Sequence, residues 1–234
     1  MPALYAIPAP LGGTAADALP ASALETVRGI RDFVAENPKT ARAFLASLQM
    51  PCPIAEISIT RLDEHTSAGA VPALLAPLRA GRPLGLLSEA GCPAIADPGA
   101  ALVDVAHREG FRVVPLIGPS SITLALMASG LEGQRFAFCG YLPREAKERA
   151  RRIREIEQRS RRERETQIFI ETPYRNDALA AALLNACAPS TRLCIASDLT
   201  LQTERISTHP IAEWRKSVPA LGKRPTVFLM LATE

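Results

Sequence analysis

The stretch of residues 84–99 constrains the fold more than any other part of this sequence. Residues 84–87 are apolar and have the length of a buried strand, and Ala90-Gly91-Cys92-Pro93 then interrupts regular structure. Asp97-Pro98-Gly99 forms a second break before helix-spaced apolar residues, with Asp97 placed to cap that helix and Pro98 at its first position. In open α/β sheets, small ligands bind at such a junction of strand, loop and helix N-terminus.

Two further loops repeat this arrangement. The apolar residues 3–7 end at Pro8-Ala9-Pro10-Leu11-Gly12-Gly13, where two glycines and two prolines beyond the strand exclude regular structure. The apolar residues 111–117 end at Gly118-Pro119-Ser120-Ser121, where either serine is placed to cap the next helix. Three loops of the same kind favour a ligand-binding site more than any one of them alone.

The order of expected elements indicates an α/β protein with two domains. Strands and helices alternate up to about residue 115, and a second α/β unit follows in which residues 193–199 and 204–209 alternate like paired antiparallel strands. With 234 residues, 47% of them hydrophobic, the chain is long enough for two modest domains. We expect domains at residues 1–116 and 117–234, with no further C-terminal domain.

Polar residues follow the next two expected strands. Glu36 and Lys39 lie where a strand meets a helix that Asn37 would cap and Pro38 would begin. His65 follows a later strand beside two carboxylates. Each of these residues has two interpretations: Glu36 and Lys39 are either chemical groups or surface charges, and His65 is either a positioned base or a solvated turn residue.

Residues 144–165 form a charge-dense helix with ten basic and six acidic residues and an expected buried stripe of Ala146, Ala150, Ile153 and Ile156. Its charges are typical of a solvated helix with pairs four residues apart. Because arginine outnumbers lysine, contact with phosphate groups is the alternative. No aromatic residues are interleaved, so base stacking is not indicated. The lone Trp214 is expected to be a packing anchor.

Several classes of protein are excluded at this level. The net charge of +3 is too weak to indicate a polyanionic partner by itself. The five cysteines and three histidines lack the paired spacing of metal ligands, so no metal site is expected. The first ten residues contain three prolines and no basic region, and no apolar run approaches about 20 residues. We therefore expect a cytoplasmic protein without a membrane span.

Short motifs stand in a characteristic order from residue 4 to residue 231. They include Ala9-Pro10-Leu11-Gly12, Val34-Ala35-Glu36-Asn37-Pro38-Lys39, Glu64-His65, Ser88-Glu89-Ala90-Gly91-Cys92-Pro93, Pro115-Leu116-Ile117-Gly118-Pro119-Ser120, Gly140-Tyr141-Leu142-Pro143 and Ile170-Glu171-Thr172-Pro173-Tyr174-Arg175. This order resembles the S-adenosylmethionine-dependent methyltransferases of the tetrapyrrole methylase fold. Within that fold it is most similar to the small-subunit ribosomal RNA methyltransferase I family.

The resemblance implies a two-domain α/β protomer, a homodimer, and S-adenosylmethionine bound in the cleft between the domains. The cofactor needs an apolar slot for adenine and polar groups for its ribose and carboxylate. Carried over motif by motif, its expected contacts are Leu11, Ala90, Gly91, Cys92, Ile95, Ser120, Ser121, Glu171, Leu199 and Thr226.

The reaction implied is methylation of the ribose 2′-hydroxyl of a cytidine, with small-subunit rRNA or the small ribosomal subunit as partner. A ribose hydroxyl is a poor nucleophile, so a base or hydrogen-bond acceptor would help. The catalytic candidates are Glu36, Lys39, His65 and Glu89, of which Lys39 would hold phosphate. The substrate-binding candidates are Pro10 and Arg175, and Arg175 would hold RNA phosphate as Lys39 would.

The sequence departs from the family pattern at three motifs. Glu36-Asn37-Pro38-Lys39 stands where the family usually has Glu-Asp-Thr-Arg, and Glu89 and Cys92 stand within the family's Ser-Asp-Ala-Gly-Thr-Pro. Ala9-Pro10-Leu11-Gly12-Gly13 replaces Thr-Pro-Ile-Gly-Asn. Two alternatives therefore stay open: a methyltransferase of the same fold acting on a tetrapyrrole or another small acceptor, and a non-catalytic protein that binds S-adenosylmethionine.

Overall fold

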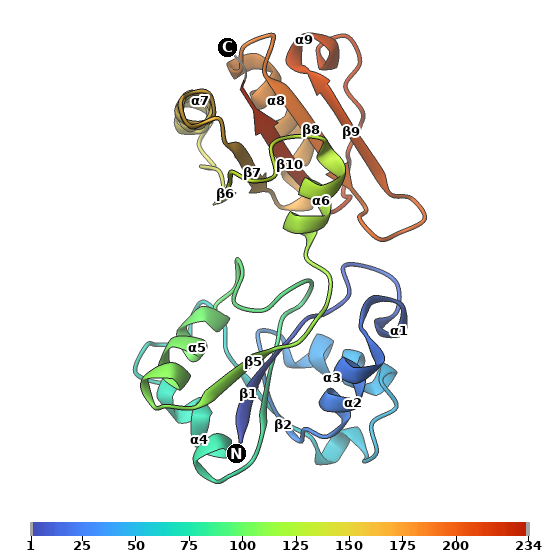
Figure 1. Ribbon diagram of the computed structural model, residues 1–234, viewed down its shortest axis with the longest axis vertical. Helices are drawn as coiled ribbons and strands as arrows, with labels where there is room; N and C mark the ends of the chain where they lie inside the picture. The colour runs from blue at the N-terminus through green and yellow to red at the C-terminus, as the bar shows by residue number, and fades with distance from the viewer. Residues whose placement is uncertain (1, 233–234) are drawn as a thin grey trace. The chain divides into compact units, whose positions relative to one another are not determined.

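The computed structural model describes residues 2–232, and the chain divides into two compact units between Ser120 and Ser121 (Figure 1). The division falls in the loop between strand β5 (Arg112–Pro115) and helix α6 (Ser121–Ser129). The boundary expected after residue 116 lies in the same loop. Each unit has its own sheet and its own buried core.

The first unit is a parallel five-stranded sheet in the order β3-β2-β4-β1-β5. Its other strands are β1 (Ala3–Ile7), β2 (Asp32–Ala35), β3 (Ser58–Arg61) and β4 (Leu84–Leu87). Its helical segments are α1 (Ala15–Ala18), α2 (Ala21–Arg28), α3 (Pro38–Ser47), η1 (Ile54–Glu56), η2 (Val71–Leu75), α4 (Ala76–Arg79) and α5 (Gly99–Arg108).

Helices cover both faces of this sheet, as Figure 1 shows. Alternate side chains of β2 explain why: Phe33 packs among the residues of α1, α2 and α3, while Val34 packs among those of η2, α4 and α5. Because β4 is buried on both faces, its sequence is continuously apolar rather than alternating.

The strand that precedes His65 is short, because η1 occupies the residues directly after Pro53 and β3 begins only at Ser58. Residues 71–79 form a 3-10 turn followed by a short α-helix, and a proline lies in the first turn of each segment. One local expectation needs correction. Helix α5 begins at Gly99, so Pro98 is the cap residue rather than the first helical residue.

The second unit is a mixed five-stranded sheet in the order β6-β7-β10-β8-β9. Its strands are β6 (Phe136–Tyr141), β7 (Thr166–Ile170), β8 (Arg192–Ser197), β9 (Arg205–Pro210) and β10 (Thr226–Leu231). Only β6 and β7 pair in parallel, and the expected antiparallel pairing of β8 with β9 is confirmed. Its remaining helical segments are α7 (Ala146–Glu163), η3 (Pro173–Arg175), α8 (Asn176–Ala186) and α9 (Ile211–Trp214).

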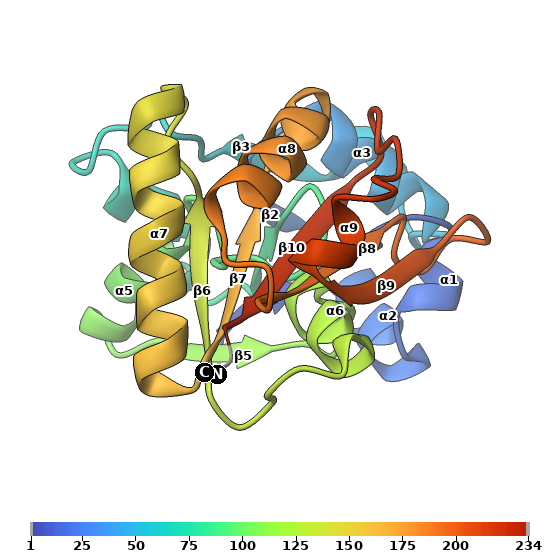
Figure 2. The same cartoon turned by 90° about the horizontal axis from the view of Figure 1, so that it is seen from above.

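The core of the second unit lies between its sheet and helices α7, α8 and α9, and Figure 2 shows α7 running alongside β6. Trp214 is buried there and its Nε1–H donates to the Leu193 carbonyl at 2.8 Å, so the expected packing role is confirmed. On α7, Ile153 and Ile156 are buried as expected. Ala146, the first residue of the helix, is exposed instead, and Ala150 is half-buried.

Gly85 offers a test of how tightly the first sheet is packed. A Cβ at this position would lie 2.5 Å from Cδ1 of Phe33 and 2.8 Å from Cδ1 of Ile7. We expect Gly85→Ala to lower the free energy of unfolding by about 1–3 kcal/mol, because the aromatic ring must leave its position. Urea unfolding measures the change. Gly133→Ala is the matched control, since a Cβ there meets nothing within 4 Å; equal losses in both variants would contradict the prediction.

Candidate functional site

The topology of the first sheet places its switch point at the carboxyl ends of β1 and β4. These strands are neighbours, but the chain leaves β1 through α1 and α2 on one face and leaves β4 through α5 on the other. Because the two connections diverge, the sheet is open between them, and ligands of open α/β sheets bind at this point. The loops after β1 and β4 are two of the three that the sequence singles out.

Two hydrogen bonds tie these loops together. The Ala9 N–H donates to the Gly91 carbonyl at 2.9 Å, and the Gly91 N–H donates to the Ala9 carbonyl at 3.0 Å. Gly91 has φ +72°, which a residue without Cβ adopts freely. The Gly91 N–H is therefore already paired within the protein and is not free to bind a ligand.

The loop after β5 joins the same group. The Cys92 thiol contacts the Pro119 carbonyl at 3.5 Å, and a Cβ on Gly91 would lie 3.4 Å from Cδ2 of Leu11. Gly118 passes so close to Pro8 that a Cβ would lie 2.5 Å from the proline Cβ. The structure therefore brings Leu11, Gly91 and Cys92 together beside the segment that leads to Ser120.

The rest of the β4 loop has unusual backbone geometry. Ala94 and Ala96 have φ +65° and φ +61°, a left-handed conformation that costs an alanine about 1–2 kcal/mol. The Asp97 carboxylate holds this turn by accepting from the N–H groups of Ala94 at 2.7 Å and Gly99 at 2.9 Å. Between the two strained residues, Ile95 is 49% exposed. An apolar side chain held out by a strained, hydrogen-bonded turn is suited to contact a ligand.

In the second unit, Glu171 follows the last residue of β7 and is the most notable polar group. Its side chain is only 1% exposed, and it pairs with the Arg175 guanidinium one helical turn later. Its Oε1 also accepts from the Thr172 N–H at 2.7 Å. Arg175, expected to bind substrate, thus uses part of its guanidinium to neutralise Glu171.

The strand register places two further candidates near Glu171. Val227 pairs with Ile170 and Thr226 pairs with Ser197, so Thr226 lies between the end of β7 and the end of β8. The hydroxyls of Ser197 and Thr226 are 2.9 Å apart. Leu199 is buried in the loop after β8, between Asp198 at φ +54° and Thr200 at φ +73°. Ser121, the first residue of α6, is half-buried in the same unit.

Carboxylates gather at the ends of β2 and β4 in the first unit. Burial raises the pKa of Glu36 above its ordinary value, and the negative charges of Glu89 and Asp97 raise it further. Glu89 accepts a hydrogen bond from the Thr40 hydroxyl at 3.3 Å. The structure therefore brings Glu36 and Glu89 together, and sequence reasoning missed Thr40 because its pairing depends on the contact between α3 and the β4 loop.

The other two catalytic candidates are more exposed. Lys39 begins the exposed face of α3, and its N–H donates to the Asn37 side chain at 3.1 Å, which confirms Asn37 as the helix cap. The His65 side chain is 83% exposed, and its Nε2 lies 3.6 Å from Glu64 Oε1. Within residues 2–232, no hydrogen bond joins the His65 ring to Glu36 or Glu89, so its geometry is that of a solvated turn residue.

Within the described part of the chain, no group of three or more metal-ligating side chains is assembled. None of the described helices is long and apolar enough to cross a membrane.

Comparison with known proteins identifies relatives over most of the chain. Residues 4–214 match the family described as Tetrapyrrole (Corrin/Porphyrin) Methylases. The chain is 33% identical over 207 residues to the Ribosomal RNA small subunit methyltransferase I of Mesorhizobium japonicum, an alignment that covers 88% of this chain and 67% of that protein. It is 31% identical to the protein of the same name from Vibrio cholerae, with 91% and 70% covered.

Solved structures share the fold. The methyltransferase CobJ superposes with a TM-score of 0.65 at 17% identity, covering 99% of this chain and 95% of that chain. The cobalt precorrin-4 methyltransferase CbiF superposes with a TM-score of 0.61 at 15% identity, covering 97% and 94%. The expected two-domain α/β fold is confirmed by these matches.

The raised pKa of Glu36 gives a prediction about its neighbour. Replacing Glu89 by Gln removes a negative charge, so the pKa of Glu36 should fall towards its ordinary value of 4.5. Carbon-13 NMR of the Glu36 carboxyl measures this titration. Glu109→Gln is the control with the same change in charge, because Glu109 pairs with Arg79 elsewhere. An unchanged Glu36 titration in Glu89→Gln would contradict the assignment.

The raised pKa of Glu36 also makes the stability of the protein depend on pH. Because folded Glu36 holds its proton more tightly than the unfolded chain does, its contribution to stability falls as the pH rises from 4.5 through the raised pKa. Glu89→Gln should make that fall smaller.

Proposed function

Because the chain belongs to the tetrapyrrole methylase family, and is therefore an S-adenosylmethionine-dependent methyltransferase, we propose that it methylates the ribose 2′-hydroxyl of a cytidine in small-subunit ribosomal RNA. The names of the relatives at 31–33% identity support a ribosomal RNA acceptor. The structural observation that carries the proposal is the pair Glu36 and Glu89 beside the Gly91–Cys92 loop, since a neutral hydroxyl needs a proton acceptor.

The residues of each unit fit what S-adenosylmethionine requires. Leu11 and the exposed Ile95 offer apolar surface for an adenine ring, and Gly91 lets the backbone of the β4 loop lie close to Leu11. Glu171, Thr226 and the Ser197 hydroxyl offer polar partners for a ribose. No fingerprint of phosphate-binding glycines is needed, because this cofactor carries no phosphate.

The bound cofactor supplies a methyl group already activated on a positively charged sulfonium. The protein therefore contributes mainly positioning and electrostatics. The negative charges of Glu36 and Glu89 favour a cationic donor. The Glu36 carboxylate accepts the proton of the attacking hydroxyl. Thr40 holds the Glu89 carboxylate in place, and exposed Lys39 is available for an RNA phosphate.

The other candidates take supporting roles in this proposal. Arg175 acts on the cofactor side by neutralising and orienting Glu171, and Pro10 shapes the acceptor side of the β1 loop. His65 lies at the rim as an exposed residue. The active form is a homodimer in the cytoplasm. In support of a second copy, β6 is an edge strand whose aromatic ends, Phe136 and Tyr141, are exposed.

Transfer of labelled methyl from S-adenosylmethionine to small ribosomal subunits tests the acceptor. Subunits from cells lacking this gene should accept label, and nuclease digestion should place it on the ribose of a cytidine. The same protein should leave subunits from normal cells unlabelled, because their site is already methylated. Label on a base, or only on a tetrapyrrole offered in parallel, would refute the proposed acceptor. Cofactor binding without any transfer would favour a non-catalytic role.

Glu36→Gln tests the proton acceptor. Turnover should fall about 10²-fold or more, because the hydroxyl loses its base, while the affinity for S-adenosylmethionine measured by calorimetry should stay within a factor of two. Glu64→Gln, which removes an exposed carboxylate nearby, is the control and should retain turnover. Unchanged turnover in Glu36→Gln would remove this residue from the mechanism.

A further inference from the structure

Helix α7 carries its charges in two separate groups. Ile153, Ile156, Glu157 and Ser160 form its buried face, and every other residue from 151 to 163 is exposed. Acid and base alternate closely in the sequence, but the 3.6-residue repeat of an α-helix places the exposed acids on one flank, together with Arg152, Arg159 and Arg162, and leaves the other flank without acids.

One flank of the helix is basic at four of its five positions. Lys147, Arg151, Arg154, Gln158 and Arg161 follow one another at intervals of three or four residues, so they line one side of the helix. We call these five residues the basic stripe. At 1.5 Å per residue it is about 21 Å long. It contains no acidic residue.

The acidic residues of α7 lie elsewhere. Glu148, Glu155 and Glu163 lie on the opposite flank, and Glu157 is buried, where it accepts from the Ala188 N–H at 2.8 Å and from the Thr191 hydroxyl. Glu155 is shared between Arg151 at 3.6 Å and Arg152 at 3.4 Å, and Arg151 remains 74% exposed. Loose surface pairs of this kind contribute little and leave a guanidinium available to another anion.

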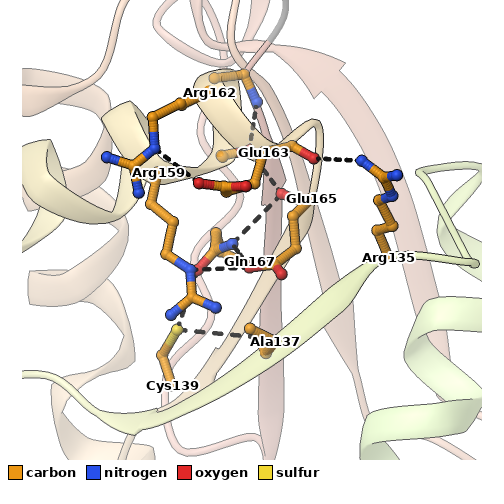
Figure 3. Close-up of polar contacts among 10 residues, drawn as sticks. Arg135, Ala137, Cys139, Arg159, Arg162, Glu163, Glu165 and Gln167 are labelled. Carbon is orange, nitrogen blue, oxygen red and sulfur yellow. Dashed lines mark hydrogen bonds and ion pairs between the residues drawn. The ribbon is translucent and has the colours of Figure 1, made fainter.

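The opposite flank is occupied by internal contacts, as Figure 3 shows. Arg159 turns towards the sheet and pairs with Glu165 at 3.0 Å, and Arg162 pairs with Glu163 at 2.7 Å. Glu163 also offers its carbonyl to Arg135 at 3.3 Å. These pairs lie at the C-terminal end of α7, on the flank away from the basic stripe.

Charge is also distributed unevenly between the units. Residues 1–120 contain nine basic and eleven acidic residues, a net charge of −2, while residues 121–234 contain eighteen and thirteen, a net charge of +5. Within the first unit, acids gather around Glu36. A polyanion is repelled there and must be held by cations elsewhere.

We propose that the basic stripe of α7 binds the phosphate backbone of the RNA acceptor. This inference rests on the proposed function, and it assigns the anchoring of RNA to a surface that carries no catalytic residue. Arginine suits the task because its planar guanidinium donates two hydrogen bonds to one phosphate. No aromatic residue lies in the stripe, so the contact follows the backbone and does not read bases.

The test compares two triple variants with equal loss of charge. Lys147, Arg151 and Arg154 are changed to Gln in the stripe variant, and Arg108, Arg152 and Arg162 are changed to Gln in the control. Gln keeps helix propensity close to that of Lys and Arg. Binding of fluorescent small-subunit rRNA is measured by anisotropy over a range of salt concentrations, with circular dichroism to verify folding. Arg154→Glu alone is the second stripe variant in case the triple variant unfolds.

We expect the stripe variant to bind the rRNA at least tenfold more weakly and the control less than twofold more weakly. Loss of three phosphate contacts should reduce the slope of log K against log salt by about 2. Equal affinities and slopes in the two triple variants would overturn the inference. So would stripe-dependent binding to vesicles of anionic phospholipid without binding to RNA.

Methyl transfer by the same proteins separates this inference from the proposed function. If the rRNA is methylated but its affinity is the same with and without the basic stripe, only the role of the stripe in RNA binding is refuted. If the rRNA binds through the stripe but is not methylated, the role of the stripe is supported and the proposed acceptor is refuted.

Discussion

The pair of hydrogen bonds between Ala9 and Gly91 holds the candidate site together. Parallel strands leave their connecting loops unpaired, so the ends of β1 and β4 would otherwise be free to separate. The pairing extends contact beyond the sheet and fixes where Leu11 and Cys92 lie. Cys92 then joins the third loop through the Pro119 carbonyl. The loops that follow three strands are joined into one surface because the N–H and carbonyl groups of Ala9 and Gly91 bond to each other rather than to a ligand.

That rigid edge also determines the electrostatics of the site. Strands β2 and β4 are adjacent, so Glu36 and Glu89 emerge side by side, although 53 residues separate them. Partial burial and mutual repulsion together raise the pKa of Glu36, which makes it a better proton acceptor than an isolated surface carboxylate. The same negative edge is a poor place for RNA phosphates. The acceptor's ribose hydroxyl and the cationic donor can meet at this edge if most of the RNA phosphates are held by cations outside it, which agrees with the excess of basic residues in the second unit.

The sequence predicts local features of this fold well and long-range ones poorly. Proline and glycine end the strands at residues 7 and 87, and Asn37 with Pro38 marks the start of α3, because turn and cap chemistry is local. The contact of Glu89 with Thr40 depends on which strands are neighbours, which no short window contains. Glu171 and Arg175 lie four residues apart in the sequence, a spacing that indicates an ion pair. The motif that contains them nevertheless led us to expect that Arg175 contacts an RNA phosphate.

The departures from the family pattern can now be examined for their physical effect. Asn37 caps α3 through its side-chain oxygen, as Asp would, so it keeps Glu36 in place while removing one negative charge from its surroundings. Glu89 keeps the carboxylate of the usual Asp, and its longer side chain reaches Thr40. Cys92 replaces a Thr hydroxyl with a thiol that still contacts the Pro119 carbonyl. At Asn37, Glu89 and Cys92 the residue present retains a polar group at the site, so these three changes are compatible with an active methyltransferase.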